Sequence, residues 1–392
     1  MRLFSHTDME ERALLEGLYR AALEAVEPGR RTRTALAEPS LDRARRKARR
    51  IGIFAAGKAA AAMARGALAQ LGPCEVFAVL PKGYPSQGLP RGAVAFASHP
   101  EPDASSMRAA RRALRFFRSF GEGDLIVCLI SGGASSLLAL PKPGVTLAEK
   151  RRAVRELVRT GASILAVNRL RASLSAVKGG RLGRATRARL ATLVLSDVPG
   201  DRAAVVGSGP TLRGRRGDFV RVVGSNADGV EAAASEARQR GLRVVLGGRR
   251  LSGDARLAGR RLAARTKRLR PETVLLSGGE PTVALGSSSG RGGRCLELAL
   301  GAAEVLDGAS SAALLAAGSD GLDGSSYAAG AFADGTTVFR ARLLGLNPGA
   351  ALARHDTRHL FAKLGDLFVT GPTGTNVGDW VFIVEPGRRL AP

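Results

Sequence analysis

Residues 275–298 of this chain read LLSGGEPTVALGSSSGRGGRCLEL, and this pattern organises the interpretation of the whole sequence. The segment begins inside an apolar run that predicts a buried strand, and Ser277-Gly278-Gly279-Glu280 ends that strand. A second short strand is expected over 282–285, followed by two glycine-rich loops. Gly293 then leads into Arg294 and into apolar residues at helical spacing. The sequence therefore predicts a glycine loop that opens a helix with Arg294 in its first turn.

A loop of this kind suits an anionic ligand. The free backbone N–H groups and the positive end of the helix dipole favour negative charge at a helix start. Glycine lets the backbone approach a ligand closely, and the planar fork of Arg294 matches a phosphate or a carboxylate. The alternative is a hairpin and a helix start whose arginine is merely solvated, and this stretch alone leaves both interpretations open.

The same pattern occurs earlier in the chain. An apolar strand expected over 124–130 is followed by Ser131-Gly132-Gly133-Ala134-Ser135. Two glycine loops after two strands predict two walls of one ligand cleft.

Length and element order predict two α/β domains. The chain has 392 residues, which is enough for two cores, and only 4% of them are aromatic, so Leu, Val and Ala are expected to fill those cores. Strands alternate with helices, which predicts a largely parallel sheet between helices in each domain. We expect an N-terminal Rossmann-like domain over 1–245, a connecting segment over 246–271 and a C-terminal domain over 272–392, with the active-site cleft between the two domains.

The chain is strongly basic, with a net charge of +26. Arginine supplies nearly all of the positive charge and is spread along the expected helices, while aromatic stacking partners are scarce. We therefore expect small anionic substrates and no specific nucleic acid. No apolar run of about 18 residues and no signal peptide are visible. Three widely spaced cysteines without metal-ligand spacing fit a reducing cytoplasm.

The segment Gly52–Lys58 matches the G-x-x-x-x-G-K part of a phosphate loop, but Ala59 replaces the Ser or Thr that would hold Mg²⁺. Its intervening residues are apolar and predict a strand, so we reject a phosphate loop here. Lys58 is still expected in the first turn of a helix, where the dipole disfavours a cation. Either a bound anion compensates for this or the lysine is simply exposed.

Carboxylates follow two other expected strands. Asp197 comes after the strand over 190–195, and Asp320 and Asp323 lie in a glycine-rich loop after the strand over 312–317. These side chains predict a metal or nucleotide site, with Asp-rich turns as the alternative. His99 also follows a strand, where open α/β folds bind ligands, although a lone histidine is more often structural.

Two further segments are site candidates. Lys178 stands before a Gly-Gly helix stop, and the alternative there is a basic surface helix with a glycine C-cap. The loop over 370–379, which contains Thr373, Thr375 and Asn376, is rich in glycine and threonine and joins two apolar strands.

Taken together, these motifs resemble the glycerate 2-kinase family, whose members carry a MOFRL C-terminal domain and are often labelled hydroxypyruvate reductases. The resemblance covers nearly the whole chain. The motifs that carry it are Gly57-Lys58-Ala59, His99-Pro100-Glu101-Pro102-Asp103, Ser131-Gly132-Gly133, Lys178-Gly179-Gly180, Ser196-Asp197-Val198-Pro199-Gly200-Asp201, Ser208-Gly209-Pro210-Thr211, Gly278-Gly279-Glu280, Gly292-Gly293-Arg294, Asp320-Gly321-Leu322-Asp323-Gly324 and Thr370-Gly371-Pro372-Thr373-Gly374-Thr375-Asn376.

The resemblance implies ATP- and Mg²⁺-dependent phosphorylation of D-glycerate at its 2-hydroxyl. It implies that Lys58 and Arg294 are functional, and we take Asp197 as the candidate base. The candidate Mg²⁺ ligands are Asp197, Asp320 and Asp323. The candidate substrate- and nucleotide-binding residues are Ser131, Gly132, Gly133, Ser135, Lys178, Gly278, Gly279, Glu280, Gly293, Thr373, Thr375 and Asn376. Phosphoryl transfer is mostly positioning and charge neutralisation, which these residue types provide.

The chain departs from the family pattern at a few positions. Cys295-Leu296 stands where the family usually has Asn-Gln, and Ser173 stands where it usually has His. These changes leave open a kinase for another small hydroxy acid. A hydroxypyruvate reductase is less favoured, because no strand leads into G-x-G-x-x-G. A homodimer is one possible assembly.

Overall fold

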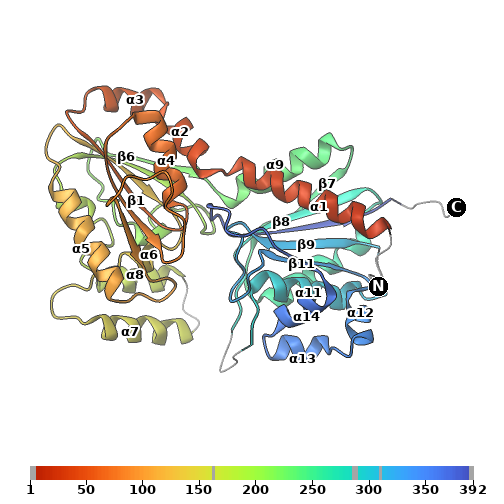
Figure 1. The fold of residues 1–392 in the computed structure, drawn as a ribbon. Coiled ribbons are helices and arrows are strands. Elements are labelled where there is room, and N and C mark those ends of the chain that lie inside the picture. Colours follow the sequence, from red (N-terminus) through yellow and green to blue (C-terminus); the bar gives the residue numbers. More distant parts are fainter. Residues whose placement is uncertain (1–5, 161–163, 285–289, 309–310, 388–392) are drawn as a thin grey trace. The chain divides into compact units, whose positions relative to one another are not determined.

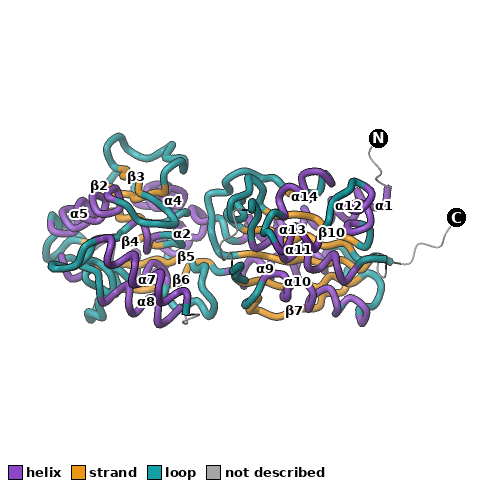
Figure 2. The backbone as a smooth tube through the Cα atoms, turned by 90° about the horizontal axis from the view of Figure 1, so that it is seen from below, coloured by secondary structure: helices purple, strands orange, loops and turns teal. Residues whose placement is uncertain are grey.

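The structure is a computed structural model that describes residues 6–160, 164–284, 290–308 and 311–387. The chain forms two compact units. The N-terminal unit comprises residues 27–225 and 374–377, and the C-terminal unit comprises the rest. Each unit has one six-stranded sheet with helices on both faces (Figures 1 and 2). Among the described helices, none has the length and apolar character needed to cross a membrane.

The sheet of the N-terminal unit is entirely parallel, with the order β3-β2-β1-β4-β5-β6. Its strands are β1 (Ile51–Ala56), β2 (Glu75–Pro81), β3 (Val94–Ala97), β4 (Leu125–Ile130), β5 (Arg189–Leu195) and β6 (Phe219–Gly224). This is the doubly wound order, and its direction reverses between β1 and β4, where open α/β sheets bind ligands. The strand β1 also confirms that Gly52–Lys58 is not a wrapped phosphate loop.

The helices of this unit are α2 (Pro28–Leu36), α3 (Pro39–Arg46), α4 (Ala60–Leu71), α5 (Ala104–Arg118), α6 (Ala134–Leu137), α7 (Leu147–Arg159) and α8 (Ile164–Ser173). Helices α2 and α3 begin at Pro28 and Pro39. Both prolines occupy the first turn of a helix, where a missing N–H costs nothing. Glu27 additionally caps α2 by accepting a hydrogen bond from the Gly29 N–H at 2.7 Å.

Phenylalanines gather in the core of the N-terminal unit. Phe54, Phe77, Phe116, Phe117 and Phe120 belong to one buried cluster, and the rings of Phe54 and Phe117 meet edge to face with centroids 5.1 Å apart. Leu, Val and Ala make up most of the remaining members of this cluster, as expected, and five of the 13 phenylalanines gather among them.

The sheet of the C-terminal unit has the order β11-β10-β9-β12-β8-β7. Its strands are β7 (Arg243–Leu251), β8 (Thr273–Gly279), β9 (Ala313–Gly318), β10 (Gly330–Asp334), β11 (Leu367–Phe368) and β12 (Asp379–Glu385). Four strands run one way, but β10 and β12 run the other way, so only β7 and β8 pair in parallel. The expected largely parallel sheet is thus confirmed in the N-terminal unit and becomes a mixed sheet here, because β9 connects to β10 without a crossover helix.

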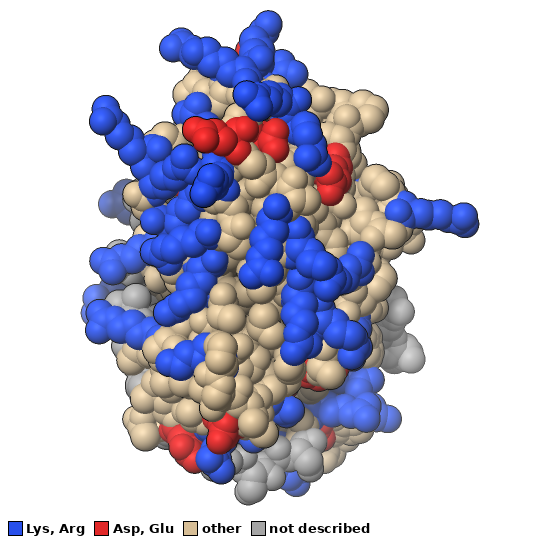
Figure 3. Space-filling model, turned by 90° about the vertical axis from the view of Figure 1, so that its left-hand side faces the viewer, with Lys and Arg blue, Asp and Glu red and all other residues tan. Residues whose placement is uncertain are grey.

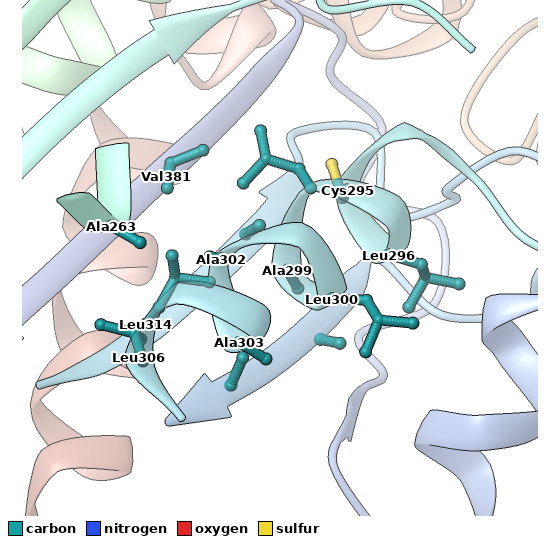
Figure 4. Close-up of a cluster of buried hydrophobic side chains, with 14 of the residues drawn as sticks. Ala263, Cys295, Leu296, Ala299, Leu300, Ala302, Ala303, Leu306, Leu314 and Val381 are labelled. Carbon is teal, nitrogen blue, oxygen red and sulfur yellow. The ribbon is translucent and has the colours of Figure 1, made fainter. Parts of the chain in front are cut away.

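The helices of this unit are α1 (His6–Ala25), α9 (Asn226–Gln239), α10 (Ala255–Ala264), α11 (Arg294–Leu306), α12 (Thr337–Leu343), α13 (Pro348–Ala353) and α14 (Thr357–Leu364). The predicted helix after Gly293 is confirmed as α11, and Figure 4 shows its apolar side chains packed with those of β9 and β12. The strand predicted over 282–285 is not formed at Thr282, which makes only an isolated bridge with Asp254, and residue 285 lies outside the described part.

The predicted domain boundaries differ from the two units. Helix α1 belongs to the C-terminal unit, since the Tyr19 hydroxyl donates to the Gly318 carbonyl at 2.9 Å and its ring packs edge-on against Trp380. Helix α9 belongs there too, and residues 246–271 form β7 and α10 instead of a connector. An amphipathic helix shows which of its faces is buried, but not which sheet it covers, so the sequence could not assign α1.

Candidate functional site

In the N-terminal unit, the loops after β1 and β4 interlock. The Lys58 N–H donates to the Gly132 carbonyl at 2.9 Å, and the Ala59 N–H donates to Ser131 Oγ at 3.1 Å. A Cβ at Gly57 would lie only 2.1 Å from Ser131 Oγ, so the two loops require glycine at this contact. Lys58 is half-buried and precedes the first turn of α4. The point where the strand order reverses therefore carries both predicted motifs.

Other predicted residues surround this loop. A Cβ at Gly132 would lie 1.9 Å from Asp197 Oδ2 and 2.1 Å from Asn376 Nδ2, and Asn376 Nδ2 donates to Asp197 Oδ2 at 3.1 Å. A Cβ at Gly133 would lie 3.2 Å from His99 Nε2. The fold thus brings Lys58, His99, Asp197 and Asn376 around the Ser131–Gly133 loop, although these residues are far apart in the sequence.

Lys178 is buried and lies beside Ser135, so the alternative of a surface helix is excluded. Its side chain is 1% exposed, and Nζ donates to Ser135 Oγ at 2.5 Å. Ser135 Oγ lies 3.0 Å from Ser208 Oγ, which donates to Asn168 Oδ1 at 3.1 Å. Burial, with the charges of two neighbouring cations, holds the pKa of Lys178 well below its usual range.

In the C-terminal unit, Arg294 lies in the first turn of α11, as predicted, and is its first residue. All three of its donor nitrogens face carboxylates. Nη1 donates to Glu280 Oε1 at 2.6 Å, and Nη2 donates to Asp379 Oδ1 at 3.0 Å. Nε lies 3.0 Å from Asp379 Oδ2 in an ion pair whose angle is poor for a hydrogen bond. Burial raises the pKa of Asp379 to about 6, although Arg294 opposes this. The guanidinium is therefore held by one buried and one half-exposed acid.

Asp323 has a structural role in this unit. Its two carboxylate oxygens accept hydrogen bonds from the Cys295 and Leu296 N–H groups at 3.1 and 2.9 Å, which satisfies the free donors at the start of α11. A Cβ at Gly293 would lie 2.2 Å from the Asp323 carboxyl carbon. Burial and the nearby Asp379 raise the pKa of Asp323 to about 7, although the two N–H bonds lower it. Asp323 is thus a helix cap.

The remaining candidates of the C-terminal unit contact backbone or side-chain atoms of the same unit. Asp320 Oδ1 accepts from the Leu322 N–H at 3.1 Å, and Thr373 Oγ1 donates to the Ser319 carbonyl at 2.5 Å. A Cβ at Gly278 would lie 1.9 Å from Asn226 Oδ1, and one at Gly279 would lie 2.2 Å from the Leu251 carbonyl oxygen. Thr375, which belongs to the N-terminal unit, is buried.

The predicted set of three metal ligands is not assembled within either unit. Asp197 belongs to the N-terminal unit, whereas Asp320 and Asp323 belong to the C-terminal unit. Among the described residues, no group of three or more His, Cys, Asp or Glu side chains is placed to hold a metal ion.

The two departures from the family pattern lie in different surroundings. The side chains of Cys295 and Leu296 are buried in the core of the C-terminal unit, where they contribute to packing. Ser173 is exposed, and its hydroxyl donates to the Leu170 carbonyl at 3.0 Å within its own helix.

Sequence reasoning missed several residues of these clusters. Asp379 was noted only as the end of a loop. It begins the buried strand β12, and burying a carboxylate is costly unless it is paired. An acidic residue directly before an apolar strand is therefore the signal that could have identified it. His355 was not among the candidates either, and its Nδ1 lies 2.7 Å from Oε1 of the buried Glu297.

Comparisons with known proteins cover most of the chain. Residues 14–224 match a family model described as a domain of unknown function, DUF4147, and residues 273–379 match the MOFRL family. A protein of Thermotoga maritima named D-glycerate 2-kinase is 33% identical, with 93% of this chain and 96% of that protein covered. A protein of Agrobacterium vitis named putative hydroxypyruvate reductase is 36% identical, with coverage of 95% and 94%.

A solved structure extends the likeness to three dimensions. The crystal structure of glycerate kinase from Thermotoga maritima has a TM-score of 0.83 and 31% identity, covering 96% of this chain and all of that chain. These findings confirm the resemblance, because one family model matches more than half of the chain and the relatives are above 30% identical over nearly its full length. The chain belongs to the glycerate 2-kinase family with a MOFRL C-terminal domain.

Proposed function

We propose that this protein is an ATP-dependent glycerate 2-kinase, which transfers the terminal phosphoryl group of MgATP to the 2-hydroxyl of D-glycerate. The observation that carries the proposal is the convergence of Lys58, the Ser131–Gly133 loop and Asp197 where the strand order of the parallel sheet reverses. The relatives named glycerate 2-kinase and glycerate kinase, which match nearly the whole chain, support it.

The first requirement of phosphoryl transfer is to position and neutralise a charged group. Gly132 and Gly133 let the backbone approach the phosphates closely. The Lys58 side chain passes this loop, with its Cγ 3.4 Å from the position of a Cβ at Gly133, and its ammonium neutralises the negative charge that develops on the transferred group.

The second requirement is a group that accepts the proton of the substrate hydroxyl. Asp197 fills this role, because its carboxylate lies directly against Gly132. Asn376 donates to Asp197 Oδ2 at 3.1 Å and thereby fixes the orientation of the carboxylate. Asn376 is therefore a positioning residue for this reaction.

Arg294 binds an anionic group of a substrate, either a phosphate or the glycerate carboxylate. The buried Asp379 holds the guanidinium through Nε and Nη2. Glu280 is 36% exposed and holds only Nη1, so it is the partner that an anionic substrate displaces most readily.

Magnesium enters as part of the substrate MgATP, and it neutralises phosphate charge there. Mg²⁺ bound with nucleotides needs only one or two protein carboxylates besides phosphate and water oxygens. Both oxygens of Asp323 are engaged in capping α11, so Asp320 and Asp197 are the better matches to this requirement.

A hydroxypyruvate reductase is the second candidate, because of the name given to the Agrobacterium vitis relative. Such an enzyme needs a nicotinamide site, yet no strand of this sequence leads into G-x-G-x-x-G with an acidic residue about 20 positions later. A fluorescence titration with NADH and NADPH tests this alternative, and we expect no binding.

The direct test of the kinase is ADP release from MgATP with D-glycerate, L-glycerate and hydroxypyruvate as separate acceptors. We expect release only with D-glycerate. Cys295 and Leu296 lie in the core and Ser173 lies on the surface, so the differences from the family pattern at these positions alter no group of the proposed site. Release with none of the three acids would overturn the assignment.

A further inference from the structure

The N-terminal unit buries a lysine that has no partner. Lys150 lies in α7 and is 4% exposed, and its Nζ has no hydrogen-bond partner among the residues that the structure describes. A buried ammonium without a partner is costly, because it loses its hydration and gains nothing in return. Many Lys and Arg side chains of this protein lie on the surface (Figure 3), so a buried lysine differs from the usual placement of cations here.

The surroundings of Lys150 make its burial more costly still. Burial, together with the charges of Arg171 and Arg181, lowers the pKa of Lys150 to about 8. The charges of Lys150 and Arg171 likewise lower the pKa of Lys178, the buried lysine beside Ser135. Lys150, Arg171 and Lys178 form no ion pair with any carboxylate in the described part of the chain. Three cations of one unit thus share a region that holds no compensating charge.

The region is connected to the proposed reaction site. Ser135, which accepts from Lys178, lies two residues after Gly133, and Gly133 in turn approaches Lys58. Ser208 Oγ lies 3.0 Å from Ser135 Oγ and adds another hydroxyl. Arg171 and Ser135 are both partly exposed, so a ligand reaches the cations from their side.

We propose that Lys150, Arg171 and Lys178 form a phosphate subsite, in which a phosphate group of the ligand supplies the charge that these cations lack. A phosphate carries about two negative charges and three acceptor oxygens, which matches three cationic donors and the Ser135 hydroxyl. The proposal rests on the kinase function for the source of the phosphate, which is either the nucleotide or the phosphorylated product.

The test compares Lys150→Met with Arg152→Met. Methionine keeps the length of the side chain and removes the charge, whereas Arg152 is an exposed cation of the same helix and serves as the matched control. Calorimetric titration with inorganic tripolyphosphate measures the subsite without any acceptor acid. We expect binding to weaken about tenfold or more in Lys150→Met, the loss typical of a charge-assisted contact, and to stay unchanged in Arg152→Met.

A thermal melt accompanies the titration, because replacing an unpaired buried charge with an apolar side chain is neutral or stabilising. An unchanged or higher Tm together with weaker binding supports the subsite. Unchanged tripolyphosphate binding in Lys150→Met would overturn it, and so would equal losses in both variants, which would indicate only diffuse attraction. Arg171→Gln gives a second measure, and it should weaken binding in the same way.

Kinetics then identify the source of the phosphate. If the nucleotide occupies the subsite, Lys150→Met raises the KM for ATP and leaves inhibition by 2-phosphoglycerate unchanged. If the product occupies it, the inhibition constant of 2-phosphoglycerate rises instead. Wild-type protein that phosphorylates glycerate but binds no tripolyphosphate would overturn the subsite and leave the kinase function intact.

Discussion

The two units of this protein differ in the charged groups that lie beside their cations. In the N-terminal unit, the buried cations Lys150 and Lys178 lie near Arg171 without a carboxylate beside them. In the C-terminal unit, four carboxylates, those of Glu280, Asp320, Asp323 and Asp379, are gathered near the single guanidinium of Arg294. One unit has unpaired positive charge, and the other has an arginine that its own acids hold in place.

This difference shows two ways in which a protein can present cations to an anionic ligand. Unpaired cations attract an anion strongly but destabilise the unit that holds them. An arginine held by acids is rigid and well oriented, but an anionic ligand must compete with those acids for it. We therefore expect variants of the two clusters to respond differently, and the following changes test that contrast.

The largest effect is expected for Lys58→Ala in the N-terminal unit. Loss of one cation that stabilises the transferred group lowers kcat by about 1,000-fold, because the developing negative charge is then less well neutralised. Steady-state kinetics with D-glycerate and ATP measure the change. Lys142→Ala, at an exposed position of the same unit, should retain wild-type activity. Full activity in Lys58→Ala would show that the reaction does not use this site.

Gly132→Ala tests the close approach of Asp197 to the loop. The new methyl group would lie 1.9 Å from Asp197 Oδ2, so the carboxylate must move away, and a displacement of about 1 Å costs about 100-fold in rate. Gly121→Ala is the matched control, since a Cβ there meets nothing within 4 Å. If both variants have equal kcat, Asp197 does not act at this position.

The C-terminal cluster is tested by comparing Asp379→Asn with Glu280→Gln. Asp379 is buried and faces two nitrogens of Arg294, whereas Glu280 is half-exposed and holds one. We expect kcat/KM to fall about tenfold more in Asp379→Asn than in Glu280→Gln, since the buried contact orients the guanidinium. A larger loss in Glu280→Gln would show that Glu280 is itself an essential contact and not a displaceable partner.

The smallest effect is a pH dependence of stability in the C-terminal unit. The pKa values of Asp323 and Asp379 in the folded state, about 7 and about 6, lie above those of an unfolded chain. The folded unit therefore holds more protons, and its stability falls as pH rises from about 4 to 7. Trp380, the single tryptophan, is buried in this unit, so its fluorescence during urea unfolding reports this unit.

Asp323→Asn provides the control for this dependence. It removes one of the two titrating groups, so the slope of stability against pH should become smaller even if the loss of the helix cap lowers stability at every pH. A stability that rises between pH 5 and pH 7 in the wild type, with Trp380 as the probe, would contradict the account of this cluster.

The sequence was sufficient for the local elements that carry the chemistry. The glycine loop after an apolar strand was visible at Ser131–Gly133, and α11 was predicted with Arg294 in its first turn. The second predicted loop, at Ser277-Gly278-Gly279, is wrong, because these residues continue β8 and pair with β12. The two correct predictions rest on short-range physics, namely the period of apolar residues and the freedom of glycine. The type of reaction was predicted from the family resemblance and not from these local patterns.

What the sequence could not reveal depends on long-range packing. Lys150 stands in a run of charged residues that reads as a solvated helix face, and only the fold shows that it points inward. Asp323 was predicted to bind a metal ion, but whether its carboxylate faces a ligand or the N–H groups of Cys295 and Leu296 depends on how two distant segments meet. The same reason explains why α1 was assigned to the wrong unit.

The most direct test of the central claim is the position of the phosphate on the product. The protein is incubated with MgATP and D-glycerate, and enolase, which accepts 2-phosphoglycerate and not its 3-isomer, is then added alone. The account predicts immediate formation of phosphoenolpyruvate. A signal that appears only after phosphoglycerate mutase is also added would show phosphorylation at the 3-hydroxyl and would contradict the claim.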